Sequence, residues 1–433
     1  MTPKLLPACL WLAFLPLAAH AQAPAQAPAV QPHIQAFPRT PDPALTRNGS
    51  VSWPTPDALQ LTANPGSDNV RYAWTTAPAP GTGWDLSGKA TLQAELKNTG
   101  QHPADVQLWA LASSGWDAVC SAAKLQPGES QILSCNLRDT FPDGTPKLDP
   151  TRVTGFQIIL VNPRKDAAVQ IRNVQASGTP AKPWARPAQR LEVPPTTDGL
   201  PAPGKRVRHP GPGGLTAALY LPPDWKPGGF YPVIAEYPGN IFFVPGCYST
   251  GLPDHCVMGY GMSEGRGAIW VALPFVEPAS NRIAENGWGD PDATASFALE
   301  FLATVFKQFG GDPARTVLTG FSRGAIACGF IGLRNDRIAA LWKGFHACQH
   351  YDGDGWNGAL MPDALERARR FKGRAVFQTD NPAQKFQPLM EAMGVEAVWR
   401  SSGLGAHACA MFLDQRPSTL ELRRWFRDLV AAP

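Results

Sequence analysis

The chain has 433 residues, which is too long for one ordinary domain, so at least two folded domains are expected. Hydrophobic residues make up 44% of the chain and charged residues 17%, a balance that is typical of a folded protein and excludes a disordered one. The net charge of +4 is too small and too scattered to indicate a protein that binds nucleic acid.

The N-terminus carries the features of an export signal. Lys4 precedes the apolar residues 5–17, and Ala19-His20-Ala21 matches an A-x-A cleavage site. The apolar segment is too short to span a bilayer, and no later segment reaches about 20 apolar residues, so no membrane span is expected. We therefore expect residues 1–21 to be a signal peptide and the mature protein to be periplasmic or secreted.

The next part of the chain reads as a tether followed by an all-β domain. Residues 22–47 are rich in Pro, Ala and Gln and form no core pattern, which is typical of a linker. In residues 48–178, the segments 91–96 and 106–111 place apolar residues mostly at alternate positions, and 155–161 reads as a more fully buried strand. Turn signals separate these segments. The pattern predicts an antiparallel β-sandwich.

A resemblance sharpens this prediction. Asp85-Leu86-Ser87-Gly88, the segment 92–98 and the closing segment 169–174 look like the jelly-roll modules attached to agar-degrading enzymes. The resemblance covers about 100 residues and implies a carbohydrate-binding module, with polysaccharide as a partner. The alternative is a sandwich that only supports the second domain.

Residues 179–214 form a second proline-rich linker, and the remaining residues 215–433 change in character. Apolar strand-like segments at 217–221, 233–237 and 268–273 give way to helical patterns at 293–309 and 417–431. Alternating strands and helices predict an α/β domain with a mainly parallel sheet. In such a sheet, functional residues are expected at the C-terminal ends of the strands.

The pattern G-x-S-x-G in this domain predicts a nucleophilic serine. Ser322 stands between Gly320 and Gly324, after an apolar strand-like segment and before a helix-like one. A serine at a strand-to-helix turn adopts a strained conformation, so small neighbours are needed, and its hydroxyl becomes accessible to a base and a substrate.

A base and an acid are expected downstream, in the order Ser, Asp or Glu, His. His407 lies in a small-residue loop after a strand-like segment, and it is the predicted general base. Asp380 directly follows the strand-like segment 374–379 and is predicted to orient the His407 ring. Asp352 and Asp354, in the loop after the preceding strand, are the alternative acids.

The remaining site predictions concern an oxyanion hole and the substrate. Backbone N–H groups of Arg323 and of Asn240 or Ile241 are the predicted oxyanion donors. The Arg323 side chain is predicted either to bind an acidic group of the substrate or to pair with a nearby carboxylate. Trp288 is predicted to stack on a sugar ring, with packing as the alternative role.

Seven cysteines remain after the signal peptide is removed, and in an oxidising compartment they can form disulfides. The favoured pairs are Cys120 with Cys135, Cys247 with Cys256, and Cys348 with Cys409. Cys328 is then left as a buried free thiol. No cysteine spacing is typical of a zinc site, and no motif indicates a metal or organic cofactor.

Residues 215–433 resemble the α/β-hydrolase superfamily over about 220 residues, with secreted esterases of the feruloyl-esterase and polyhydroxyalkanoate-depolymerase type as the nearest relatives. The segment 310–320 carries this resemblance, whereas Arg323 and Pro238-Gly239-Asn240 depart from the usual motifs. The resemblance implies an exported serine carboxylic-ester hydrolase that acts on ester groups of a polysaccharide or related polymer through an acyl-enzyme. A serine peptidase of the same superfamily, or a non-catalytic carbohydrate-binding protein with a degenerate hydrolase domain, is the alternative.

Overall fold

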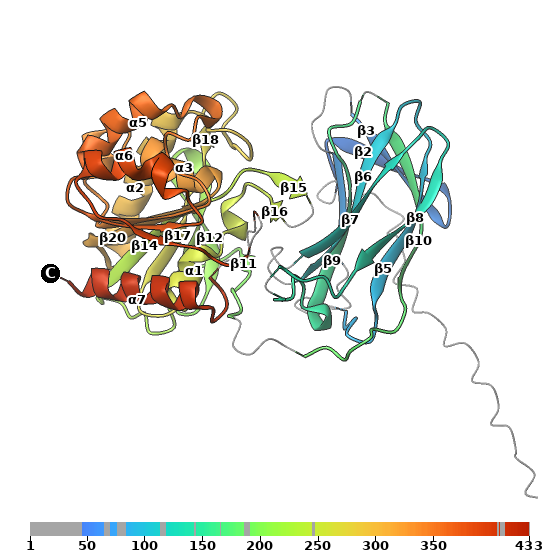
Figure 1. Ribbon diagram of the computed structural model, residues 1–433, viewed down its shortest axis with the longest axis horizontal. Coiled ribbons are helices and arrows are strands. Elements are labelled where there is room, and N and C mark those ends of the chain that lie inside the picture. The colour runs from blue at the N-terminus through green and yellow to red at the C-terminus, as the bar shows by residue number, and fades with distance from the viewer. Residues whose placement is uncertain are drawn as a thin grey trace, which may run out of the picture.

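The computed structural model describes residues 46–64, 70–75, 84–112, 118–142, 144–164, 166–185, 191–244, 247–404, 407 and 412–432. The predicted signal peptide and nearly all of the first linker lie outside these residues. Within them, every helix is too short or too polar to cross a bilayer. Figure 1 shows two bodies side by side, one made of strands and one of a sheet covered by helices.

The N-terminal body, called here the β-sandwich, contains two five-stranded sheets with the strand orders β1-β4-β9-β6-β7 and β2-β3-β10-β5-β8. All of their pairings are antiparallel. The strands are β1 (Thr46–Arg47), β2 (Gly49–Thr55), β3 (Ala58–Ala63), β4 (Val70–Thr75), β5 (Thr91–Asn98), β6 (Ala104–Ala112), β7 (Ala118–Leu125), β8 (Ser130–Asn136), β9 (Val153–Leu160) and β10 (Ala168–Ser177), with a 3-10 turn η2 (Pro150–Arg152).

Alternating side chains of both sheets form the core of the β-sandwich. Leu92, Ala94 and Leu96 of β5 share one buried cluster with Val106 and Leu108 of β6. Because successive side chains of a strand point to opposite faces, the residues between them point outward. The predicted alternation at 91–96 and 106–111 therefore corresponds to real inward and outward faces.

The predicted disulfide between Cys120 and Cys135 is wrong, because both residues are free thiols in the structure. The same alternation of side chains explains why. Cys135 points into the core of the sandwich, whereas Cys120 packs on the outer face of β7. Side chains on opposite faces cannot bring their sulfur atoms together. Cys256 is also free, and Cys247 and Cys409, the predicted partners of Cys256 and Cys348, lie outside the described side chains.

The C-terminal body, called here the α/β domain, is built on a nine-stranded sheet with the order β11-β12-β13-β17-β14-β20-β21-β22-β23. Pairings from β17 to β23 are parallel, and those of β12 with β13 and β13 with β17 are antiparallel. Within this mainly parallel sheet, β20 runs into the turn at Ser322, and a helix follows directly.

The bounds of its elements are as follows. The strands are β11 (Thr196–Thr197), β12 (Arg206–Pro210), β13 (Thr216–Tyr220), β14 (Tyr231–Tyr237), β15 (Phe242–Val244), β16 (Cys247–Ser249), β17 (Ile269–Ala272), β18 (Val276–Glu277), β19 (Arg282–Ile283), β20 (Gly311–Phe321), β21 (Gly344–Cys348), β22 (Ala375–Thr379) and β23 (Val398–Arg400). The helices are α1 (Met258–Ser263), α2 (Pro291–Phe309), α3 (Arg323–Phe330), α4 (Asp336–Ala339), α5 (Met361–Ala368), α6 (Ala383–Met393) and α7 (Pro417–Ala431), with 3-10 turns η3 (Pro212–Gly214), η4 (Pro253–His255), η5 (Trp356–Gly358) and η6 (Arg369–Phe371).

Helices cover both faces of this sheet. Figure 1 shows α1 and α7 on one side and α2, α3, α5 and α6 on the other. Helix α2 begins where the Asp290 carboxylate accepts the N–H groups of Asp292 and Ala293, and it ends at Gly310, whose φ of 72° suits glycine. With both faces buried, the ends of the central strands are the part of the sheet left for a site.

Candidate active site

Ser322 occupies a sharp turn between β20 and α3. Its backbone angles, φ 55° and ψ −119°, are rare for a residue with a side chain. A Cβ atom on Gly320 would overlap the backbone of Gly324, and a Cβ on Gly324 would overlap the carbonyl of Tyr237. Both glycines of the motif are therefore needed for the helix to start so close to the sheet.

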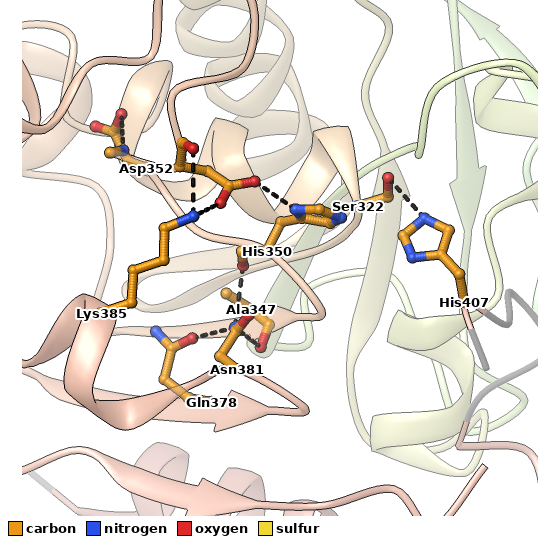
Figure 2. A network of polar contacts seen from close by, with 10 residues as sticks. Ser322, Ala347, His350, Asp352, Gln378, Asn381, Lys385 and His407 are labelled. Carbon is orange, nitrogen blue, oxygen red and sulfur yellow. Dashed lines mark hydrogen bonds and ion pairs between the residues drawn. The ribbon is translucent and has the colours of Figure 1, made fainter. Parts of the chain in front are cut away.

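His407 faces this serine. Its Nε2 lies 3.1 Å from Ser322 Oγ, within hydrogen-bond distance (Figure 2). Its ring packs against Phe321 and Phe242. Burial, together with the nearby imidazole of His350, lowers the pKa of His407 to about 4. The ring is therefore neutral at neutral pH, which is the form that can accept a proton from the serine.

Asp380 lies close to His407, but its carboxylate is bound elsewhere. It follows β22, as predicted, and accepts hydrogen bonds from the backbone N–H (2.6 Å) and the hydroxyl of Ser402. Among the described residues, no hydrogen bond joins Asp380 to His407. The two residues line the same cavity, of about 640 Å³. The predicted acid therefore lies near the predicted base without being hydrogen-bonded to it.

The alternative acids have other partners. Asp352 is buried and accepts two hydrogen bonds from the guanidinium of Arg367, at 2.8 and 2.9 Å. Its charge is therefore paired with Arg367 and not with a group at the serine. Asp354 lies 2.5 Å from His350 Nδ1 and also pairs with Lys385. Burial raises the pKa of Asp354, but the hydrogen bonds from Lys385 and His350 outweigh this effect and leave the pKa below its ordinary value.

His350 and Lys385 were missed by the sequence analysis as members of the site. Figure 2 shows both in the same network, on the other side of Ser322 from His407 in this view. The ring centres of His350 and His407 lie 5.3 Å apart, and Asn381 fixes the His350 carbonyl with a 3.0 Å hydrogen bond. The acidic loop after β21 was visible in the sequence, but its proximity to the serine depends on the order of strands in the sheet.

A cavity of about 370 Å³ opens in front of the serine and is lined by Ser322, His407, His350 and Asn240, among others. Two aromatic side chains border it. Phe242 is 42% exposed and Trp356 is 37% exposed, although large apolar side chains are usually buried. An opening with aromatic walls and a few polar groups suits a small-molecule or polymer-end ligand.

The structure distinguishes between the predicted oxyanion donors. The N–H of Ile241 donates to the Glu285 carbonyl at 2.8 Å, so it is not available for a substrate oxygen, contrary to one of the predictions. For the N–H groups of Asn240 and Arg323, no acceptor is recorded within the described part of the chain. The side chain of Asn240 accepts the N–H of Gly287 at 3.0 Å, which holds its loop in place.

The side chain of Arg323 has a structural position, which corrects its prediction as a substrate-binding group. It is 1% exposed, and its guanidinium lies 4.0 Å from the ring centre of Phe275. Burial lowers the pKa of Arg323 to about 9, so it is charged at neutral pH. Its two terminal nitrogens donate at 2.7–3.1 Å to four backbone carbonyls, those of Ala284, Gly287, Gly239 and Gly251.

Trp288 is also a packing residue rather than a sugar-stacking surface. It is 6% exposed, stacks on Phe330 with ring centres 4.5 Å apart, and donates its indole N–H to the Asn357 carbonyl at 2.8 Å. The exposed Trp356 contacts its edge. Trp356, not Trp288, is therefore the tryptophan that borders the cavity.

No cluster of three or more His, Cys, Asp or Glu suited to a metal ion occurs within the described ranges. Cys328, predicted as a buried free thiol, is free and buried behind the serine, with its Sγ near the carbonyls of Gly324 and His346. Burial raises the pKa of this thiol above its ordinary range, so it stays protonated.

Comparison with known proteins adds little to this geometry. No protein-family model matches the chain, and no curated protein matches it in sequence. Among solved structures, it is similar to brefeldin A esterase, a bacterial homologue of human hormone-sensitive lipase, at 16% identity over 56% of this chain and 80% of that chain, with a TM-score of 0.35. It is also similar to the AtxE2 isopeptidase bound to astexin3-dC4, at 16% identity over 90% of this chain and 63% of that one, with a TM-score of 0.38. Because these TM-scores lie below 0.5, we base no conclusion on the similarities.

Proposed function

We propose that this protein is an exported serine hydrolase that cleaves carboxylic esters through an acyl-enzyme. One observation carries the proposal: Ser322 Oγ, on a strained turn that opens into a cavity, lies 3.1 Å from Nε2 of His407. A hydroxyl paired with a neutral imidazole is the arrangement that an activated serine nucleophile requires.

In the proposed reaction, Ser322 Oγ attacks the ester carbonyl carbon while His407 Nε2 takes the hydroxyl proton. The electron pair displaced onto the carbonyl oxygen is stabilised by the N–H groups of Asn240 and Arg323. When the tetrahedral intermediate collapses, the C–O bond to the alcohol breaks, and His407 returns the proton to the departing oxygen. Water then repeats the sequence on the acyl-enzyme and releases the acid.

Asp380 is the proposed acid of this relay. It shares a cavity with His407. It follows β22 at the C-terminal edge of the sheet, whereas the alternative acids follow the neighbouring strand β21. Its present partner, Ser402, lies in the segment that leads to His407. A carboxylate near His407 is needed because burial opposes the imidazolium that forms during the reaction.

For the substrate, we propose ester groups of a polysaccharide or a related polymer. Export of the protein, which we propose from the N-terminal pattern, would bring it to such polymers, and the exposed Phe242 and Trp356 offer aromatic faces beside the cavity. Mass spectrometry of the secreted chain tests the export step, with a mature N-terminus at Gln22 as the expected result.

The direct experiment compares the wild type with Ser322→Ala. The wild type should hydrolyse p-nitrophenyl acetate and react with a fluorophosphonate probe at Ser322, whereas the variant should lose turnover by roughly 10³-fold or more and escape labelling. Circular dichroism should show the same fold for both. Equal rates for the two proteins would exclude the serine mechanism, and faster cleavage of aminoacyl anilides than of esters would favour a peptidase instead.

A substrate screen then addresses the polymer. Acetylated, feruloylated and methyl-esterified polysaccharides should be compared with their short-chain p-nitrophenyl analogues, with Ser322→Ala as the blank. We expect release of acid from at least one polymer. Hydrolysis of the small esters alone would remove the polymer from the proposal and leave the serine mechanism in place.

A further inference from the structure

Two large apolar side chains on one outer face of the β-sandwich are buried although they point away from the sandwich core. Trp109 of β6 and Ile159 of β9 lie between the core-facing residues of their strands, yet they are 1% and 0% exposed. They pack with Ile241 of the α/β domain in a separate apolar cluster. Figure 1 shows the β15–β16 hairpin, which starts next to Ile241, on the side of the α/β domain that faces the sandwich.

This contact lies at the proposed oxyanion loop. Ile241 directly follows Asn240, and Phe242, which borders the cavity, comes next. Fixing Ile241 therefore restrains the Asn240 N–H, because a single planar peptide bond joins the two residues. The backbone of a catalytic donor must be held within about 0.5 Å of its productive position to be effective.

A second contact connects the same loop to the β-sandwich through Glu285. The Ile241 N–H donates to the Glu285 carbonyl at 2.8 Å, and the Glu285 carboxylate forms an ion pair with Arg47 of β1. The Glu285 side chain is 17% exposed and that of Arg47 is 37% exposed, so this pair is partly shielded from solvent. The β-sandwich thus reaches the oxyanion loop through an apolar contact and through an ion pair.

A third contact reaches the loop of the proposed acid. Thr145 of the sandwich accepts a hydrogen bond from Arg416 Nη2 at 3.3 Å, and Arg416 Nη1 donates to the Ser402 carbonyl at 3.1 Å. Ser402 in turn holds the Asp380 carboxylate. Contacts between the two domains therefore meet two separate loops that carry groups of the proposed mechanism.

The other outer face of the sandwich offers little for a sugar ring. Among side chains that the structure describes, the exposed large aromatic residues are Phe230, Phe242 and Trp356, and all three belong to the α/β domain. On β8, at the edge of the second sheet, the exposed large apolar residue is Ile132. Since recognition of sugar by a flat sheet face relies on stacking against aromatic side chains, the described faces do not favour a carbohydrate-binding role for the sandwich.

We propose that the β-sandwich is a positioning domain for the active site: through Arg47 and the Trp109 face, it holds the 239–242 loop so that the Asn240 N–H points at the substrate oxygen. This inference rests on the proposed function, because its catalytic consequence is read from ester hydrolysis. Arg47 and Glu285 are positioning residues, since neither touches the serine or lines the cavity.

A charge swap in the full-length protein tests the inference. Arg47→Glu and Glu285→Arg should each lower kcat by roughly tenfold, with KM changed by less than twofold, because a small displacement of an oxyanion donor affects the transition state more than substrate binding. The double variant, Arg47→Glu with Glu285→Arg, restores the opposite charges and should recover most of kcat. Lys97→Glu, the same charge reversal on the exposed face of β5, is the matched control and should leave kcat unchanged.

Amide hydrogen exchange of the peptide that covers residues 236–244 supplies a readout that needs no substrate. Exchange should be faster in each single variant and return to the wild-type rate in the double variant. Unchanged exchange in the single variants would overturn the inference, whether or not the protein hydrolyses esters. A wild type without esterase activity would overturn the proposed function. Faster exchange with an unchanged kcat would also overturn it, since the contact would then have no catalytic role.

Discussion

Replacing Arg323 with methionine should destabilise the protein and slow catalysis together, because the guanidinium joins the loops that surround the serine. Methionine is similar in length and keeps the contact with Phe275 but cannot donate a hydrogen bond. The four carbonyls now bound by Arg323, on residues 239, 251, 284 and 287, would then be buried without a donor. Residue 239 precedes the proposed oxyanion donor, so the effect extends to the reaction.

The size of this effect follows from two opposing contributions. A hydrogen bond from a charged group contributes about 1.5–3 kcal/mol, so four of them amount to roughly 6–12 kcal/mol. Burial of the charge acts in the opposite direction: it lowers the pKa of Arg323 to about 9, which corresponds to roughly 5 kcal/mol, since one pKa unit equals about 1.4 kcal/mol. The difference between these two contributions predicts that Arg323→Met lowers the free energy of unfolding by about 1–7 kcal/mol.

Urea denaturation, followed by tryptophan fluorescence, measures this change. Arg282→Met is the matched control, because Arg282 is exposed and pairs with Glu277 at the surface, and its loss should change stability by less than about 0.5 kcal/mol. Arg323→Lys should fall between the two, since one ammonium cannot reach all four carbonyls. If Arg323→Met unfolded at the wild-type urea concentration with an unchanged kcat, the structural role assigned to this side chain would be wrong.

Three further predictions concern titrating groups. His346, buried between Thr319 and Thr379, has a pKa lowered to about 3 by burial, so the unfolded chain binds its proton first as the pH falls. The free energy of unfolding should therefore fall as the pH is lowered from 7.5 to 4.5. Urea titrations should show a fall about 2–3 kcal/mol smaller in His346→Gln than in the wild type. Because the pKa of His407 is about 4, the acid limb of kcat/KM should lie near pH 4, and His350→Gln should move it upward; a wild-type limb at pH 6.5 would contradict this. Asp380→Asn should lower kcat by roughly 10²–10⁴-fold and Asp354→Asn by much less, and the reverse order would identify Asp354 as the acid.

The sequence was most informative where function depends on neighbouring residues. The turn at Ser322 could be predicted because its two glycines, the strand before it and the helix after it lie within one short segment. His407 could be predicted because the loop that carries it follows a strand-like segment, and the structure brings the two side chains together at 3.1 Å. In both cases, local pattern and chain order were sufficient.

Predictions that depended on contacts between distant segments were less successful. The partners of Arg323 are backbone carbonyls, which leave no signature in a sequence, so its structural role could not be separated from substrate binding. Trp288 is covered by Phe330 and Trp356, which are distant from it in the chain. The faces of Cys120 and Cys135 depend on the alternation within two strands that belong to different sheets. These outcomes required the assembled fold.

The backbone at Ser322 also has a consequence for how the protein resists heat. A side chain held at φ 55° and ψ −119° carries roughly 1–3 kcal/mol of conformational strain, which the rest of the fold must offset. Glycine would adopt these angles with ease but has no hydroxyl. The proposed catalytic hydroxyl therefore costs the protein stability, and variants selected only for heat resistance, without the proposed activity, should lose Ser322 early.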